Sequence, residues 1–390
     1  MPSFRLAVLG GGPIGAGVAL LAMVNGLHVA LWSRREETRR RARQEIEGGV
    51  AFRARRGTLP GPPGEVLSRL RLAPAVAEAV AGAQWMVEAV VEDVRVKHSV
   101  LREGEEASSP NAYLATTASW IPISHLARPL ARPERFLGLH FFNPPWARRA
   151  VEVIPGEGTA PEALSAARDL LGVLKRTPAV LYRDTPGFVG NRLLLRQYEE
   201  AVCAVARGST PDAIDGAYRF SLGFPFGPCE SMDYVGLEFV LRLFHIAIQW
   251  GWDGPPGAVA FLEERVREGR TGPTTGEGFY PYPEKRWEPP SLRPSAGEGV
   301  DLAALSAPVV LEGARLVQKG VAAPEVVETI AADCIGWGGG PFAIGRRLGL
   351  HTLQDALARL YRQEPSERYR DEGSLGAVVS WERGGTVFTS

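Results

Sequence analysis

Short apolar runs alternate with segments of helical periodicity over the first half of the chain. The apolar runs predict strands at residues 4–9, 28–32, 85–88, 113–115, 135–139, 150–154 and 179–181. The segments between them, such as 162–174, place apolar residues at helical spacing. Because strands that alternate with helices usually pair in parallel, this half predicts a largely parallel, doubly wound sheet.

The pattern changes at residues 184–187, an Asp-Thr-Pro-Gly turn that leads into a long helical segment at 188–206. Helices and loops follow, without a convincing strand run. Turn-forming residues recur here at a constant offset of 113. The first set is Pro211, Gly223, Gly227, Pro228 and Gly236, and the second is Pro324, Gly336, Gly340, Pro341 and Gly349. A constant offset without gaps indicates two copies of one helical unit.

A glycine-rich turn joins the first predicted strand to the first predicted helix. Gly10 permits a tight exit from the strand, Gly12 lets the backbone approach a pyrophosphate, and Gly15 lets the helix pack close to the strand. The helix start, with Pro13 and Ile14, offers backbone N–H groups to phosphates. A second apolar strand completes the βαβ unit, so these five residues predict a dinucleotide site rather than a merely structural turn.

The end of the second strand bears on which dinucleotide binds. Ser33 stands where an acidic residue would bond the ribose 2′-hydroxyl of NAD, and Arg34 and Arg35 follow it. Guanidinium groups pair bidentately with phosphate, so this sequence favours NADP over NAD. The alternative is that the two arginines only begin the arginine-rich helix at 34–43.

A histidine and a glutamate supply candidate chemistry. His140 lies in the segment Gly-Leu-His-Phe-Phe-Asn-Pro, and Glu152 follows twelve residues later. Histidine titrates near neutrality, which suits a general base, and a carboxylate can fix the tautomer of its ring. Together with the glycine turn, the pair predicts a hydride-transferring dehydrogenase. The alternative is a histidine packed in the core beside Phe141 and Phe142.

Length and composition narrow the setting. A chain of 390 residues exceeds one ordinary core and predicts two or three domains. With 44 basic and 44 acidic residues, it does not have the charge of a nucleic-acid binder. No apolar run approaches a membrane span, and no signal segment leads the chain. The three dispersed cysteines predict buried thiols of a cytoplasmic protein and no metal site. Only four asparagines are present, which hints at a hot habitat.

Five motifs in fixed order resemble the L-3-hydroxyacyl-CoA dehydrogenase family along almost the whole chain. They are the turn at 10–17, the segment 87–92 with Lys97, Ser119 with Pro122 and Ile123, the segment 140–144 with 151–154, and the segment 184–194. The segment 276–280 also matches a family pattern. The repeated helical unit resembles the longer members, such as the dehydrogenase part of multifunctional β-oxidation enzymes.

The resemblance assigns roles to five residues. It implies that His140 takes the proton of a 3-hydroxyl while hydride passes to the nicotinamide, and that Glu152 orients its ring. Ser119 and Asn191 would contact the substrate, and Asn143 would polarise the 3-oxygen. Two of these residues have a purely structural alternative. Asn191 would only cap a helix, and Asn143 would only hold the loop behind His140.

The same resemblance places two charged residues near the nicotinamide. Glu92 and Lys97 would line that side of the cofactor cleft. Their alternative is a solvated pair at the start of a helix.

The chain departs from the family around the substrate. Trp120 follows Ser119 where the family has a small polar residue, and residues 145–149 read Pro-Trp-Ala-Arg-Arg where it is mostly small and apolar. Trp120 and Trp146 could cage a quaternary ammonium, as in a carnitine-type dehydrogenase. Arg148 and Arg149 could instead meet the phosphates of coenzyme A or the carboxylate of a free acid.

The predicted fold is a Rossmann-like α/β domain followed by two related all-α domains. Residues 1–183 would bind NAD or NADP, 184–285 and 301–390 would be the helical copies, and the Pro/Gly-rich 286–300 would link them. Asn191 falls on Ala304 at the repeat offset, so the second copy would support the first or form a subunit contact.

The predicted activity interconverts a 3-hydroxyacyl-CoA and a 3-ketoacyl-CoA with NAD or NADP, in a homodimer or a monomer. A dehydrogenase of a free 3-hydroxy acid (carnitine or a sugar acid) is the first alternative. A non-catalytic cofactor-binding protein is the second.

Overall fold

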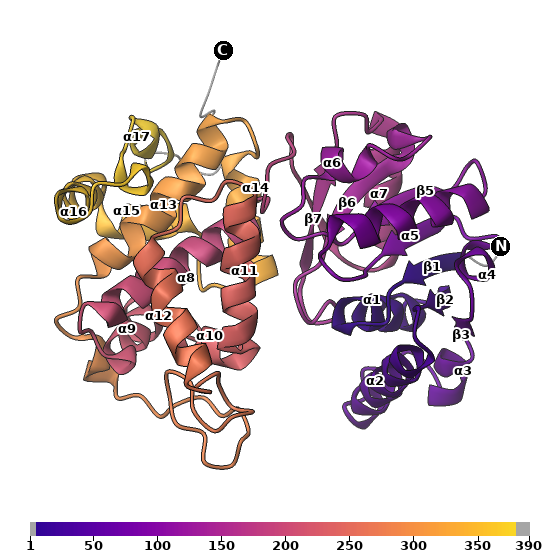
Figure 1. Cartoon of the computed structure of the whole chain (residues 1–390), viewed down its shortest axis with the longest axis horizontal. Helices are drawn as coiled ribbons and strands as arrows, with labels where there is room; N and C mark the ends of the chain where they lie inside the picture. The colour runs from indigo at the N-terminus through magenta and orange to yellow at the C-terminus, as the bar shows by residue number, and fades with distance from the viewer. Residues whose placement is uncertain (1–4, 380–390) are drawn as a thin grey trace. The chain divides into compact units, whose positions relative to one another are not determined.

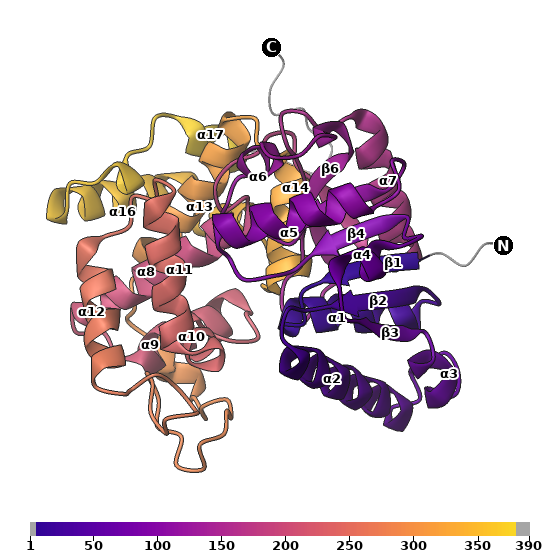
Figure 2. The same ribbon diagram turned by 45° about the vertical axis from the view of Figure 1, so that its right-hand side comes forward.

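A computed structural model describes residues 5–379 of the chain (Figure 1). It divides into two compact units, Met1–Thr185 and Pro186–Ser390. The first contains the only extended sheet in the described part of the chain, and the second consists of helices and loops (Figure 2).

The first unit is built on an eight-stranded sheet with the strand order β3-β2-β1-β4-β5-β6-β7-β8. Every neighbouring pair is parallel except β6 and β7, which are antiparallel. The strands are β1 (Arg5–Leu9), β2 (His28–Trp32), β3 (Leu70–Ala73), β4 (Trp85–Glu88), β5 (Tyr113–Thr116), β6 (Phe136–His140), β7 (Ala150–Pro155) and β8 (Thr177–Val180). All seven predicted strands are present within a few residues. The prediction missed β3, because in this short edge strand the exposed Arg71 separates two partly exposed leucines and leaves no apolar run.

Helices cover both faces of this sheet. They are α1 (Pro13–Val24), α2 (Glu36–Arg55), α3 (Pro63–Leu67), α4 (Val76–Val80), α5 (Val94–Ala107), α6 (Ile123–Ala127) and α7 (Pro161–Val173). Side chains alternate between the faces, as strand geometry requires. Leu6 and Val8 belong to the core formed with α1, α2 and α7, whereas Leu9 and Met86 lie against Gly104 of α5.

The second unit repeats one arrangement of helices. Its helices are α8 (Gly190–Ala206), α9 (Pro211–Gly216), α10 (Pro228–Val235), α11 (Leu237–Gln249), α12 (Pro256–Arg267), α13 (Leu302–Gln318), α14 (Pro324–Thr329), α15 (Pro341–Leu348), α16 (Leu350–Gln363) and α17 (Ser374–Val379). Helices α9, α10 and α11 begin 113 residues before α14, α15 and α16. A π-helical turn follows both α9 and α14. The predicted fold class, including two related all-α parts, is therefore confirmed.

The two copies also share a buried carboxylate that caps a helix start. Asp215 accepts hydrogen bonds from the backbone N–H groups of Cys229 and Glu230, at 2.9 and 2.8 Å. At the equivalent place Glu328 accepts from Phe342, at 2.7 Å. Free N–H groups at a helix start need such partners, so the two copies satisfy the same requirement in the same way.

The segment 286–300 is mostly irregular, with a short 3₁₀ helix at Pro294–Gly297 that packs against α9. It is thus held against the first copy along part of its length. The exact domain bounds stay predictions.

Candidate active site

The glycine turn has the geometry of a dinucleotide cradle. Gly10 has a φ of 137°, which a side chain rarely adopts, and it leads directly out of β1. A side-chain carbon at Gly15 would lie 2.0 Å from the carbonyl oxygen of Gly10, so only glycine lets α1 start this close to the strand. At Gly12 the same carbon would meet nothing within 4 Å, which leaves space over the start of α1. The turn therefore fits a pyrophosphate at a helix N-terminus.

The end of β2 adjoins this turn. Ser33 is half-buried beside Gly11, and its carbonyl oxygen accepts a hydrogen bond from Arg39 Nη1 at 2.5 Å. Arg34 and Arg35 are exposed and lie before α2, which begins at Glu36. Within residues 5–379, neither arginine takes part in an ion pair. Arg35 is the N-cap of α2, and its carbonyl oxygen accepts a hydrogen bond from the Arg39 N–H at 3.2 Å, so it does begin the helix as in the alternative.

His140 and Glu152 meet because of the one antiparallel pair in the sheet. His140 ends β6 and lies directly opposite Glu152 in the register of β6 and β7. Directly opposite residues point to the same face of a sheet, and here Nδ1 of His140 lies 2.5 Å from Oε2 of Glu152. Both side chains are buried. A carboxylate on Nδ1 places the proton there and leaves Nε2 as the basic nitrogen. The His140 ring also packs against Phe142, with centroids 4.6 Å apart, as the alternative of a packed core histidine expects, and Glu152 is the partner that this alternative lacks.

Glu88, Lys97 and Glu92 form a second group of charges near the same edge of the sheet. Lys97 Nζ donates to both oxygens of Glu88, at 3.0 and 3.1 Å, and lies 3.4 Å from Glu92. Glu88 also accepts from the hydroxyl of Thr116 at 2.6 Å. Lys97 is only 1% exposed, so the alternative of a solvated pair is wrong. Sequence reasoning missed the role of Glu88, although its place at the end of an apolar strand was a signal.

Glu92 holds the loop that carries Ser119. Its Oε1 accepts hydrogen bonds from the backbone N–H groups of Ser119 and Trp120, at 2.7 and 2.8 Å. Burial alone would raise the pKa of the Glu92 carboxyl, but the Lys97 charge and these N–H donors lower it below its ordinary value. Burial likewise opposes the charge of Lys97, yet Glu88 and Glu92 raise its pKa. Both shifts favour the charged forms of Glu92 and Lys97, and Glu92 fixes the serine loop.

The two remaining predicted polar residues lie in different units. Asn143 is exposed in the loop after β6, and Nε of Arg148 approaches its backbone carbonyl at 3.5 Å. Asn191 is the second residue of α8 in the second unit and is buried. The N-cap of α8 is Val189, so Asn191 does not have the simple capping role of its alternative.

Trp146 lies in a basic surrounding that the sequence did not reveal. Its ring packs against Phe52, with centroids 6.1 Å apart, and the Arg53 guanidinium lies 5.6 Å above it. Arg176 donates to the Trp146 carbonyl at 2.7 Å. Burial, followed by the nearby charge of Arg53, lowers the pKa of Arg176. Trp120, by contrast, is only 1% exposed.

Residues 5–379 contain neither a membrane-spanning helix nor a cluster of metal ligands. No helix there is long and apolar enough to cross a bilayer. In that same stretch no three metal-ligating side chains come together.

Fold and site together define an NAD-dependent oxidoreductase that acts on a CH–OH group, and the comparisons with known proteins agree. Residues 5–185 match the NAD binding domain of 3-hydroxyacyl-CoA dehydrogenase. Residues 187–282 and 302–387 match its C-terminal domain. The chain therefore belongs to the 3-hydroxyacyl-CoA dehydrogenase family.

Individual relatives show how far the likeness extends. A probable 3-hydroxybutyryl-CoA dehydrogenase of Deinococcus radiodurans is 32% identical over 71% of this chain and all of its own length. The mitochondrial hydroxyacyl-coenzyme A dehydrogenase of Sus scrofa is also 32% identical, over 71% of this chain and 91% of its own. The crystal structure of 3-hydroxybutyryl-CoA dehydrogenase from Escherichia coli K12 covers 98% of this chain and 99% of its own, with a TM-score of 0.83 and 24% identity. It shares the fold through both helical copies.

Proposed function

We propose that the protein interconverts a 3-hydroxyacyl-CoA and a 3-ketoacyl-CoA, with His140 as the general base. The observation that carries this proposal is the 2.5 Å contact between His140 Nδ1 and Glu152. In the oxidative direction Nε2 takes the proton of the 3-hydroxyl, and Glu152 stabilises the resulting imidazolium. A dinucleotide held at the turn of Gly10, Gly12 and Gly15 would supply the acceptor for the hydride of C3.

Three polar residues complete the proposed machinery. Ser119 holds the reacting oxygen, from a loop that Glu92 fixes through backbone N–H groups. Asn143, three residues after His140 and exposed, polarises that oxygen, and Asn191 contacts the substrate. Glu92 and Lys97 act mainly as positioning residues, since Lys97 is buried between two glutamates.

A coenzyme A thioester fits this chain better than a free acid. Arg53 and Arg176 surround Trp146 in the loop just after the His140 segment, and Arg148 and Arg149 belong to the same loop. Clustered guanidiniums suit the phosphates of coenzyme A. The carnitine alternative depended on Trp120, which is buried.

For the cofactor we propose NADP in preference to NAD. Ser33 offers no carboxylate to a ribose 2′-hydroxyl, and Arg34 and Arg35 are exposed beside the turn. We place the enzyme in the cytoplasm, as the three cysteines are dispersed and buried. The second helical copy already packs against the first through α8 and α13, which favours a monomer over a dimer.

The test is reductive turnover by the purified protein. Acetoacetyl-CoA, free acetoacetate and dehydrocarnitine are each mixed with NADH or NADPH, and loss of reduced cofactor is followed. We expect turnover of the thioester and faster turnover with NADPH. Turnover of a free acid alone would contradict the thioester, and cofactor binding without any turnover would favour a non-catalytic role.

A further inference from the structure

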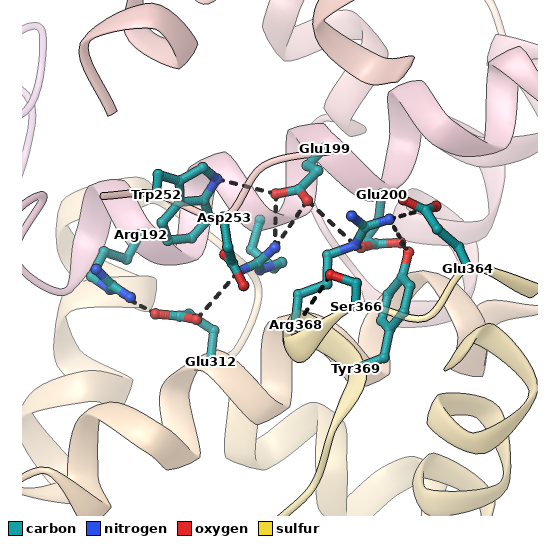
Figure 3. Close-up of polar contacts among 11 residues, drawn as sticks. Arg192, Glu199, Glu200, Trp252, Asp253, Glu312, Glu364, Ser366, Arg368 and Tyr369 are labelled. Atoms are coloured by element: carbon teal, nitrogen blue, oxygen red, sulfur yellow. Dashed lines mark hydrogen bonds and ion pairs between the residues drawn. The ribbon is translucent and has the colours of Figure 1, made fainter. Parts of the chain in front are cut away.

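The strongest unexplained feature is a buried group of charges where the two helical copies meet (Figure 3). We name it the charge seam. From the first copy it contains Arg192, Arg196, Glu199, Glu200 and Asp253, and from the second Glu312, Glu364 and Arg368. Buried ions that lose a partner are strongly destabilising, so the seam fixes one copy against the other.

One carboxylate of the second copy holds two arginines of the first. Glu312 on α13 lies 2.6 Å from Arg192 Nε and 3.6 Å from Arg196 Nη2. Residues 192 and 196 are one turn apart on α8, so they project from the same face of the helix. Arg196 is itself fixed by Glu199, with two contacts at 2.9 Å, and by Asp253 at 2.8 Å. Glu312 therefore clamps the start of α8.

The backbone at the start of α8 has an uncommon conformation. Phe188, just before the helix, has a φ of 53°, a conformation that a bulky residue rarely adopts. The N-cap is Val189, whose side chain has no polar atom to accept a helix N–H. Arg192 Nη1 donates to the carbonyl of Pro186 at 3.3 Å, which ties the preceding turn to the helix. The turn at Pro186 is thus held by Arg192, which pairs with Glu312 of the second copy.

Asn191 lies in the same turn, directly beside Arg192. At the repeat offset of 113, Asn191 corresponds to Ala304 and Glu199 to Glu312. The second copy has no amide at this place, but it has the carboxylate. The second copy therefore contributes ion pairs to α8 and not a second set of substrate contacts.

We infer that Glu312 is a positioning residue for Asn191, so that the second helical copy sets the geometry of the active site. The inference rests on the proposed role of Asn191 in the reaction. A side chain that meets substrate must be held to within a fraction of an ångström, and misplacement by about 1 Å can cost on the order of 10²-fold in rate. Loss of the clamp should therefore lower kcat while cofactor binding by the first unit is unchanged.

The experiment compares Glu312→Ala and Glu312→Gln with the wild type and with Glu364→Gln as control. Glu364 belongs to the charge seam but contacts Arg368, not α8. With acetoacetyl-CoA and NADPH we expect kcat to fall about ten- to a hundredfold in Glu312→Ala. We expect a smaller loss in Glu312→Gln, which keeps a hydrogen-bond acceptor, and none in the control. The dissociation constant for NADPH should not change.

A double variant separates positioning from general weakening. In an Asn191→Ala background, Glu312→Ala should lower kcat little further, because the residue it positions is gone. An undiminished second loss, or wild-type kcat in Glu312→Ala, would overturn the inference.

Amide hydrogen exchange tests the clamp independently of activity. Residues 186–196 should exchange faster in Glu312→Ala than in the wild type or the control. Unchanged exchange would overturn the clamp even if the enzyme is active. Absence of wild-type turnover with faster exchange would instead contradict only the proposed function.

Discussion

Each unit of this protein buries a set of charged side chains, and the two sets differ in what they face. In the first unit, Glu152 faces Nδ1 of His140, the residue that we propose as the general base. In the second unit, the guanidiniums of Arg196 and Arg368 face carboxylates of their own unit. The first arrangement prepares an atom for a ligand, and the second joins two copies of a helical scaffold.

The two sets also differ in how their acids are held. In the first unit, backbone N–H donors and Lys97 outweigh burial and lower the pKa of Glu92. In the second unit, burial outweighs the facing Arg196 and raises the pKa of Glu199 to about 8. The balance between burial and the facing charges and donors therefore differs between these two acids.

The largest effect should come from the orienting carboxylate. In Glu152→Gln the side chain keeps its size but no longer stabilises an imidazolium, so kcat should fall about 10²- to 10⁴-fold. Thermal unfolding should occur near the wild-type temperature. The matched control is Glu157→Gln, an exposed acid just beyond β7. A kcat close to that of the wild type would contradict the paired mechanism.

A substitution within the charge seam should lower the free energy of unfolding. Arg196→Met leaves Glu199 and Glu312 without the guanidinium between them, which should cost about 3–5 kcal/mol of unfolding free energy. Denaturant unfolding measures this loss. Arg370→Met, which breaks only an exposed pair with Glu367, should change it little. Equal losses in the two variants would show that the seam is no more than surface charge.

The pH dependence of stability should separate the two sets. The pKa of Glu92 is lowered on folding, so the stability it contributes is lost as pH falls below its ordinary value of about 4.5. The pKa of Glu199 is raised on folding, so its contribution to stability is lost as pH rises instead of as pH falls. The folded state then keeps a proton that the unfolded state releases above about 4.5, and stability declines as pH rises to about 8.

Thermal unfolding between about pH 5 and pH 8 checks the decline in stability assigned to Glu199. This is the range between its unfolded and folded pKa values. In Glu199→Gln the decline with rising pH should be shallower than in the wild type. Parallel curves for the two proteins would contradict the assignment to Glu199.

The smallest effect concerns cofactor choice. Ser33→Asp supplies the acid that bonds a ribose 2′-hydroxyl and repels a 2′-phosphate, so the preference should move towards NAD by about tenfold. Ratios of kcat/KM for NADPH and NADH measure it, with Ser68→Asp as a control beyond the turn. An unchanged ratio would remove Ser33 from cofactor recognition.

The sequence predicted local features well. The glycine turn, seven strands and the His140–Glu152 pair each depend on short-range pattern or on family motifs. The sheet was expected to be largely parallel, but the antiparallel pair that joins His140 to Glu152 was not foreseen. The two residues are nearby in sequence, which made the pairing recognisable without its geometry.

The charge seam lay beyond sequence reasoning because its partners are distant along the chain. Tyr369 donates to Glu200 across 169 positions, and Arg192 pairs with Glu312 across 120. Only packing of the two copies brings such residues together. One signal was present, since the repeat offset carries Glu199 onto Glu312.

The central claim is that His140 performs proton transfer in a 3-hydroxyacyl-CoA dehydrogenase. Its most direct test is the turnover of acetoacetyl-CoA with NADPH by His140→Ala, beside the wild type and His98→Ala. We predict a fall in kcat of about 10²- to 10⁴-fold in His140→Ala alone, with reduced-cofactor binding unchanged. Wild-type turnover by His140→Ala would contradict the account.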